Sequence, residues 1–321
     1  MLQGTFKRTL IGSLLALSFG AHAQINEVHF LIPGGAGGGW DNTARDTGEA
    51  LTKSGLITTA SYQNISAGGG AKAIAHLIET SAQSDKTLMV NSTPIIVKSL
   101  SKELPQSFRD LTPVAAIIAD YQALAVPLDS PYQSWPQLLA AYQENPAKVK
   151  IAGGSARGSL DHLVAAMTFK NAGADAGKLR YVAYDAGGSA MAAVLAGETQ
   201  VLSTGFGEAM EAVKSGQMRI LGMTAPTRMP DASEVPTFSE QGNPTVFANW
   251  RGYFASPTIS PEKSAEFAAL LKQMYDKPEW EVVRSRNSWT NLYKSGPEFT
   301  AFLDGQEQQI GGLMRELGFI K

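Results

Sequence analysis

The chain has 321 residues, a formal net charge of −2 and no cysteine. The absence of cysteine excludes disulfides, thiolate metal sites and cysteine nucleophiles, and no basic block interleaved with aromatic residues indicates a nucleic-acid partner. A chain of this length is expected to form about two domains with substantial cores.

Residues 1–23 are predicted to be a secretory signal peptide. Lys7 and Arg8 form a basic segment, an apolar run covers 10–19, and Ala-His-Ala at 21–23 has the small residues of a cleavage site. The apolar run is shorter than the roughly 20 residues that a membrane-spanning helix needs, so an N-terminal anchor is the weaker alternative.

We therefore expect an exported mature chain of residues 24–321, with 25 basic and 29 acidic residues. An exported chain without disulfides fits a bacterial periplasm better than an animal secretory route. Its negative balance offers no long-range attraction for an anion.

The most informative segment is a glycine loop between a predicted strand and a predicted helix. Val28–Ile32 is the apolar strand, Pro33 ends it, glycine fills positions 34, 35, 37, 38 and 39, and helical periodicity covers 42–51. Glycine leaves backbone N–H groups accessible, and a helix N-terminus carries about half a positive charge. The pattern predicts an anion-binding loop, with a merely flexible loop as the alternative.

Strand-like and helix-like segments continue to alternate along the chain. The predicted strands are 62–65, 88–90, 123–126, 149–152, 179–182, 201–204 and 219–223, and the helices are 71–80, 134–144, 161–170 and 190–196. This alternation predicts an α/β fold with a largely parallel sheet, and ligands of such sheets bind at the carboxyl ends of the strands. The tail, 261–321, is expected to be mostly helical and to pack on the first domain through Trp280, Trp289 and 299–303.

Two proline-containing segments, near Pro127 and Pro226, mark where the chain is expected to cross between domains. We therefore predict one lobe from residues 24–122 plus 224–321, and a second lobe from residues 123–223. The recurrence of strand, Gly/Ser loop and helix in both halves favours two similar lobes.

Catalytic patterns are absent from the sequence. His29, His76 and His162 lack metal-ligand spacing, and Ser155 lies in a segment one residue short of a nucleophile elbow. The glycine runs match neither nucleotide-binding motif, so a dinucleotide enzyme is a remote alternative. We expect no enzyme activity, no metal and no cofactor.

Seven segments in order resemble the TctC/Bug family of periplasmic solute-binding proteins of tripartite tricarboxylate transporters. They are Ile32-Pro-Gly-Gly-Ala-Gly-Gly-Gly-Trp-Asp-Asn-Thr-Ala-Arg45, Asn64-Ile-Ser-Ala-Gly-Gly-Gly70, Asn91-Ser-Thr-Pro94, Gly154-Ser-Ala-Arg-Gly-Ser-Leu-Asp-His162, Tyr184-Asp-Ala-Gly-Gly-Ser-Ala190, Pro236-Thr-Phe-Ser-Glu-Gln-Gly242 and Asn249-Trp-Arg-Gly252. The long first loop ending in Gly-Trp-Asp is similar to the tricarboxylate-binding branch. The resemblance implies a type II periplasmic binding protein fold, with two doubly wound lobes and a ligand cleft between them.

The resemblance also implies which residues hold the ligand. The matching positions are Gly34, Gly35, Ala36, Gly37, Gly38, Gly39, Trp40, Ser92 and Thr93 on the first lobe, and Ser155, Arg157, Gly158, Ser159, Asp185, Gly188 and Ser189 on the second.

Several side chains have two interpretations. Arg157 is expected to bind a distal carboxylate bidentately, with a solvated or ion-paired arginine as the alternative. Arg45 is spaced to pair with Asp41 instead. Asp185 would repel a carboxylate and is expected to cap its helix or orient Ser189. Trp40, like Trp250, fits either a cleft wall or a core, and His162 fits a supporting role.

The resulting hypothesis is a monomeric periplasmic protein that closes over a citrate-like di- or tricarboxylate and delivers it to the permease subunits of a transporter. The alternative is a carboxylate sensor that presents its ligand to a two-component receptor. Backbone amides recognise a carboxylate without fixing the rest of the molecule, so the particular ligand stays open.

Overall fold

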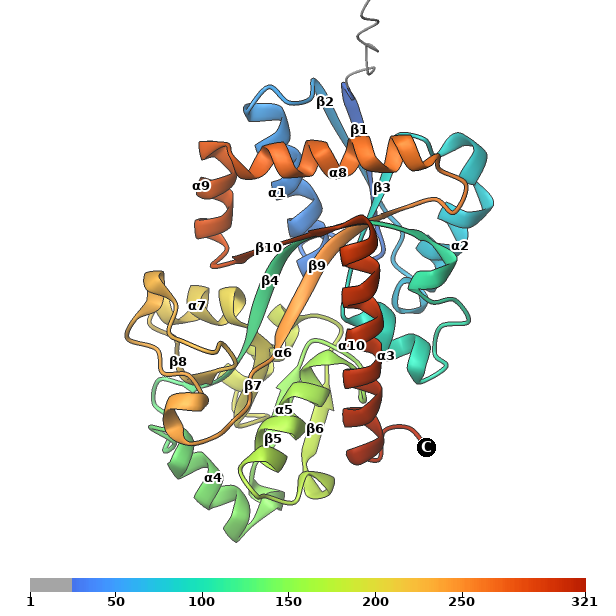
Figure 1. The fold of residues 1–321 in the computed structure, drawn as a ribbon. Coiled ribbons are helices and arrows are strands. Elements are labelled where there is room, and N and C mark those ends of the chain that lie inside the picture. The colour runs from blue at the N-terminus through green and yellow to red at the C-terminus, as the bar shows by residue number, and fades with distance from the viewer. Residues whose placement is uncertain (1–24) are drawn as a thin grey trace, which may run out of the picture.

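The computed structural model describes residues 25–321, and the predicted signal peptide therefore lies outside the described part of the chain. These residues form two α/β lobes joined by two long strands, β4 (Thr112–Pro127) and β9 (Ala248–Ala255) (Figure 1). The strand order is β2-β1-β3-β9-β4-β7-β5-β6, with β8 and β10 also paired to β4. β4 belongs to both lobes, because its first part pairs with β9 and its last part with β7 and β8.

The first lobe has helices on both faces of its sheet. Its parallel strands are β1 (Glu27–Ile32), β2 (Thr59–Asn64) and β3 (Thr87–Ser92), and β9, β4 and β10 (Thr290–Ser295) add antiparallel pairs. The helices are α1 (Gly39–Lys53), α8 (Pro261–Tyr275) and α9 (Pro278–Arg286) on one face, and α2 (Ala71–Glu79), α3 (Pro94–Leu100) and α10 (Gly296–Glu316) on the other.

The alternation of side chains along β1 explains the two faces. Val28, Phe30 and Ile32 lie in the core under α1, α8 and α9, whereas Leu31 lies in the core under α2, α3 and α10. Successive side chains of a strand point to opposite faces, so an apolar run buried on both sides supports two helical layers. The predicted packing of the tail is confirmed, since Trp280 and Phe299 are fully buried in these cores.

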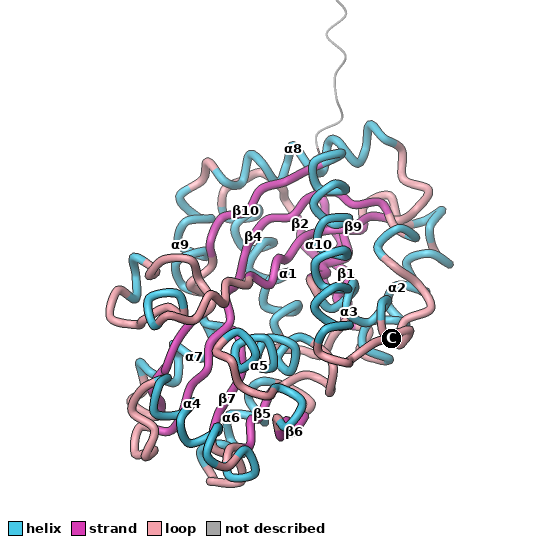
Figure 2. The backbone as a smooth tube through the Cα atoms, turned by 60° about the horizontal axis from the view of Figure 1, so that its bottom comes forward, coloured by secondary structure: helices cyan, strands magenta, loops and turns pink. Residues whose placement is uncertain are grey.

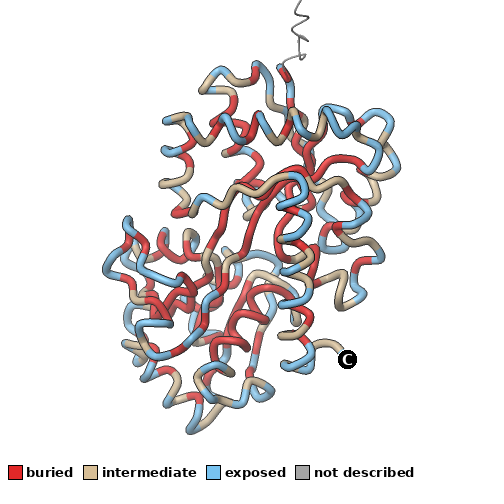
Figure 3. The backbone as a smooth tube through the Cα atoms, viewed as in Figure 1, coloured by how far each residue is buried: buried red, intermediate tan, exposed pale blue. Residues whose placement is uncertain are grey.

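The second lobe repeats this arrangement at a smaller size. Its parallel strands are β5 (Lys150–Gly153), β6 (Arg180–Ala183) and β7 (Val201–Gly205), with β8 (Met218–Met223) antiparallel to β4. The helices α6 (Gly187–Leu195) and α7 (Phe206–Lys214) cover one face, and α4 (Trp135–Glu144) and α5 (Leu160–Asn171) cover the other. Figure 2 shows helices on both sides of the strands, and Figure 3 shows buried residues along the strands that connect the lobes. The predicted α/β class with two doubly wound lobes is confirmed.

The predicted second boundary needs a correction. Residues 224–247, expected in the first lobe, pack on the second: the Phe238 ring lies 5.2 Å from Trp135, and Asn243 Nδ2 donates to the Thr168 carbonyl at 2.9 Å. The proline signal near Pro226 marks a loop that stays on the second lobe after β8. The chain returns to the first lobe only along β9.

The C-terminal segment also contacts both lobes. Leu313 of α10 packs against the second-lobe residues Leu160 and Val164, and the Phe319 ring stacks 4.6 Å from His162. Within residues 25–321, no helix combines the length and the apolar character needed to cross a bilayer.

The lobe assignment of residues 224–247 predicts the effect of truncating Phe238. This side chain is fully buried among second-lobe residues, so Phe238→Ala should lower the free energy of unfolding by about 3–5 kcal/mol through lost burial and a cavity. Urea denaturation followed by tryptophan fluorescence measures this change. Val282→Ala is the control, because Val282 is 64% exposed, and its loss should stay below about 0.5 kcal/mol. A similarly small loss for Phe238→Ala would contradict the assignment.

Candidate functional site

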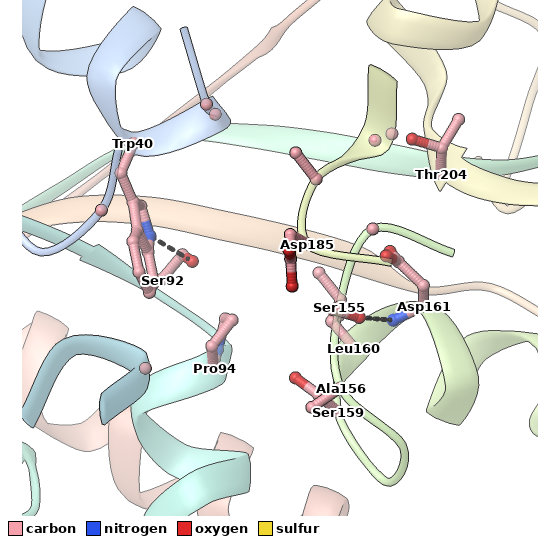
Figure 4. Close-up of a pocket in the computed structure, with 18 of the residues that line it drawn as sticks. Trp40, Ser92, Pro94, Ser155, Ala156, Ser159, Leu160, Asp161, Asp185 and Thr204 are labelled. Carbon is pink, nitrogen blue, oxygen red and sulfur yellow. Dashed lines mark hydrogen bonds between the residues drawn. The ribbon is translucent and has the colours of Figure 1, made fainter. Parts of the chain in front are cut away.

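A cleft of about 640 Å³ separates the two lobes, within the size range of small-molecule sites. Its first wall consists of the glycine loop, Ser92, Pro94 and Lys98. Its second wall comes from the loop and helix start at 154–161, the segment 183–188, and the end of β7 with the start of α7. Gln122, Asn249 and Arg251 on the connecting strands also line it. Figure 4 shows Trp40, Ser92 and Pro94 facing Ser155, Asp161 and Asp185.

A buried carboxylate fixes the conformation of the glycine loop. Asp41 accepts hydrogen bonds from the Gly37 amide at 2.8 Å, from Arg45 Nε at 2.9 Å and from Asn64 Nδ2 at 2.9 Å. Burial acts to raise the pKa of Asp41, but these hydrogen bonds outweigh it and keep the pKa below its usual value. The predicted Arg45–Asp41 pair is therefore confirmed, and Gly37 takes a positive φ of 75° that few other residues adopt.

Helix α1 begins at the cleft without a side-chain cap. Its N-cap is Gly38, and no side chain among residues 25–321 accepts a hydrogen bond from the amides of the first turn. These amides and the positive end of the helix dipole are available to an anion.

An arginine on β9 holds the first turn of α1 from behind. Arg251 Nη1 donates to the Gly39 carbonyl and to Thr43 Oγ1, both at 2.9 Å, and Nη2 donates to Asp120 Oδ2 at 2.7 Å. A Cβ on Gly39 would lie 2.8 Å from Arg251 Nη2, so a larger residue there would displace the guanidinium. Burial raises the pKa of Asp120 to about 6, against the opposing effect of the Arg251 charge.

Two further side chains complete the first wall. Trp40 Nε1 donates to Ser92 Oγ at 2.9 Å, which places the indole beside the glycine loop. Lys98 lines the cleft, its ammonium group makes no hydrogen bond or ion pair to any other residue among 25–321, and burial lowers the pKa of this group. Its Nζ lies over Gly69, where a Cβ would collide with it.

The second wall is built around the start of α5. The Asp161 amide donates to Ser155 Oγ at 3.2 Å, and Tyr181 Oη donates to the Ser155 carbonyl at 2.7 Å. Burial, with a contribution from the Glu208 charge, raises the pKa of Asp161 to about 7. His162 Nδ1 accepts a hydrogen bond from the Gly158 amide at 2.9 Å, in keeping with the supporting role predicted for it. Burial lowers the pKa of His162 to about 4.

The structure brings most of the predicted site residues to one cleft. Those that line it are Gly34, Gly35, Gly37, Gly38, Gly39, Trp40, Ser92, Ser155, Ser159, Asp185 and Gly188. Those outside its lining are Ala36, Thr93, Arg157, Gly158 and Ser189.

Contacts made elsewhere explain the main exceptions. Thr93 is fully buried, and the Gly158 amide is used by His162. Arg157 Nη1 donates to the Tyr181 carbonyl at 3.0 Å, along β6. The expectation that Asp185 caps its helix is wrong. The N-cap of α6 is Ala186, and no side chain among the described residues makes a capping hydrogen bond to this helix.

Sequence reasoning missed several residues of the lining. Lys98, Gln122, Asn249, Arg251 and Glu208 all line the cleft. The motif Asn249-Trp-Arg-Gly252 could have indicated two of these residues, Asn249 and Arg251. Of the two tryptophans left open, Trp40 lines the cleft, and Trp250 lies in the core with 0% exposure. In the described part of the chain, no group of three or more His, Asp or Glu side chains is arranged to hold a metal ion.

Two α/β lobes with a polar cleft between them define a solute-binding protein of the type II periplasmic class. The sequence pattern of the TctC family, described as the tripartite tricarboxylate transporter family receptor, matches residues 45–319. The chain belongs to this family, whose members are periplasmic solute-binding proteins and not enzymes.

Two curated relatives align with about three quarters of this chain. A UPF0065 protein from the tcbD-tcbE intergenic region of Pseudomonas sp. strain P51 is 28% identical over 74% of this chain and 70% of that protein. A UPF0065 protein of Bordetella bronchiseptica is 27% identical over 75% of this chain and 72% of its own.

Solved structures share the fold. A TctC solute-binding protein from Polaromonas is 20% identical, with a TM-score of 0.68 over 90% of this chain and 98% of that one. MatC from Rhodopseudomonas palustris, solved with malate, is 18% identical, with a TM-score of 0.75 over 89% and 98%. An R. palustris protein solved with adipate is 19% identical, with a TM-score of 0.82 over 91% and 97%.

The raised pKa of Asp161 predicts a pH dependence of stability. The folded protein holds this proton more tightly than the unfolded chain, so the resulting stabilisation is complete below about pH 4 and is lost as the pH rises through about 7. Asp161→Asn should therefore make the decline in unfolding free energy between pH 4 and 7 shallower, by on the order of 2–4 kcal/mol across that interval.

Urea denaturation at half-unit pH steps measures this slope. Asp129→Asn is the matched control in the same lobe, because Asp129 is exposed, and it should leave the profile unchanged. Identical slopes for wild type and Asp161→Asn would show that the Asp161 proton is not held by the fold.

Proposed function

We propose that this protein captures a small carboxylate, of the di- or tricarboxylate class that includes citrate, and delivers it to the permease subunits of a tripartite transporter. The observation that carries the proposal is the first wall, where an uncapped helix start, a glycine loop and the cationic Lys98 converge on one cleft. The role places the mature chain in the periplasm, after removal of residues 1–23.

Local groups must provide the attraction, because the chain is acidic overall. Helix α1 has Gly38 as its N-cap and Gly39 as its first residue, so a carboxylate can approach the backbone at this end without meeting a Cβ of either residue. Charge-assisted hydrogen bonds from amides and from an ammonium group are about twice as strong as neutral ones. Lys98, with no competing partner among residues 25–321, has its charge available for the ligand.

The second wall supplies the contacts that close over the ligand. Ser155 and Ser159 lie across the cleft from the first wall and offer hydroxyl groups (Figure 4). Gly188 also lines the cleft and offers backbone groups. The two lobes are connected through β4 and β9, so a hinge at these strands would bring the walls together. Closure is the signal by which a permease distinguishes the loaded form from the empty one.

Two related structures support the ligand class. One of these proteins was solved with malate and another with adipate, both small dicarboxylates. The family description supports the transporter partner. We extend both properties to this chain because its cleft offers the chemistry that a carboxylate requires.

Replacement of Lys98 tests the proposed anion site. Lys98→Met keeps the length of the side chain and removes its charge, so affinity for the bound carboxylate should fall by about 10- to 100-fold, as expected for loss of a hydrogen bond to a charged group. Isothermal titration calorimetry against citrate, tricarballylate, malate, succinate, adipate and aspartate measures the affinities.

Lys148→Met is the matched control, since Lys148 is an exposed lysine remote from the cleft lining, and it should bind as wild type does. Failure of wild type to bind any carboxylate would contradict the proposed function. Unchanged affinity in Lys98→Met would show that the lysine is not part of the anion site.

A further inference from the structure

The two walls of the cleft carry opposite charge. On the first wall, Arg45 neutralises Asp41, and Lys98 remains as an unpaired cation among the described residues. On the second wall, the lining includes the carboxylates of Asp185 and Glu208. A ligand that spans the cleft therefore meets a cationic side and an acidic side.

Asp185 is the acidic residue that faces the ligand space. It is exposed, lines the cleft and makes no hydrogen bond to any other residue of the described chain. Figure 4 shows its carboxylate pointing into the space between Ser92 and Ser155. No other residue of the described chain forms an ion pair with its carboxylate.

The other second-wall acids have local partners. Thr204 Oγ1 donates to Glu208 Oε2 at 2.5 Å, in the first turn of α7. Asp161 lies in the first turn of α5 and is 9% exposed, and Ser155 and the Gly154 backbone act to lower the pKa of its carboxyl group. Glu208 and Asp161 thus lie within the first turns of α7 and α5, whereas Asp185 lies before the N-cap of α6 and makes no hydrogen bond within residues 25–321.

We propose that the ligand carries a hydrogen-bond donor, an ammonium or a hydroxyl group, at the end that faces Asp185. This inference rests on the proposed function, which places a carboxylate of the same ligand on the first wall. A ligand with a carboxylate and no such donor at this end would bring like charge toward Asp185. The preferred ligands are thus amino- or hydroxycarboxylates, and not their unsubstituted analogues.

A matched ligand series tests this inference by calorimetry on the whole mature chain. Succinate, malate and aspartate differ only at C2, where they carry hydrogen, hydroxyl and ammonium, and glutarate with glutamate and tricarballylate with citrate extend the comparison. At least one donor-bearing ligand should bind about tenfold or more tightly than its unsubstituted partner. The malate and aspartate arms distinguish hydroxyl from ammonium.

The variant Asp185→Asn tests the residue. It should weaken the preferred donor-bearing ligand and strengthen its unsubstituted analogue, so that the preference ratio falls about tenfold or more. Asp129→Asn, an exposed aspartate in the same lobe, should keep the ratio of wild type.

Each outcome decides between the claims. A preference that Asp185→Asn abolishes supports the inference. Equal or tighter binding of all the unsubstituted acids overturns the inference while the proposed function stands. A preference retained by Asp185→Asn overturns the role of Asp185. Binding of no member of the series overturns the proposed function, and the inference with it.

Discussion

The buried ion pair between Arg251 and Asp120 is the interaction on which the rest of the cleft depends. The two side chains are 9% and 5% exposed and belong to the two strands that connect the lobes. Removing one partner of such a pair leaves an uncompensated buried charge, at a cost of about 3–5 kcal/mol. Arg251 also holds the Gly39 carbonyl and Thr43, so one guanidinium links the connecting strands to the first turn of α1. The position of the glycine loop is therefore set by the strands at the hinge.

This constraint makes the two walls unequal. The first wall is fixed by Arg251 from behind and by Asp41 within the loop, so its amides are arranged before any ligand arrives. Preorganised donors bind an anion without a further ordering cost. The second wall includes Asp185, whose side chain is exposed and makes no bond within residues 25–321. We infer that the first wall provides affinity for a carboxylate and the second provides selection among carboxylates.

The sequence predicted the layers of the fold and most of the loops that line the cleft, because strand, glycine loop and helix alternate with clear periodicity. It did not predict β9 or the first half of β4. The run 114–119 is uniformly apolar and has no alternation, and β9 places the polar residues Asn249 and Arg251 inside a buried strand. The burial of Arg251 is stable only because it pairs with Asp120, which lies 131 positions away in the sequence.

The same dependence on distant contacts explains why the sequence did not identify the charged side chains at the cleft. Arg157 was favoured because it lies in a Gly/Ser loop, yet its guanidinium bonds to the backbone of β6, and the arginine at the cleft comes from a strand. Lys98 sits inside a short helix with no motif around it, and only the fold shows that it lies over Gly69 and faces the cleft. Local patterns locate loops, whereas the identity of the charged groups that face a ligand depends on contacts between distant segments.

A crystal structure of the protein with its bound carboxylate tests the central claim most directly. We predict carboxylate oxygens about 2.7–3.1 Å from the first-turn amides of α1 and from Lys98 Nζ, with the rest of the ligand directed toward the second wall. A carboxylate bound on the second wall, or a ligand bound outside the cleft, would contradict it.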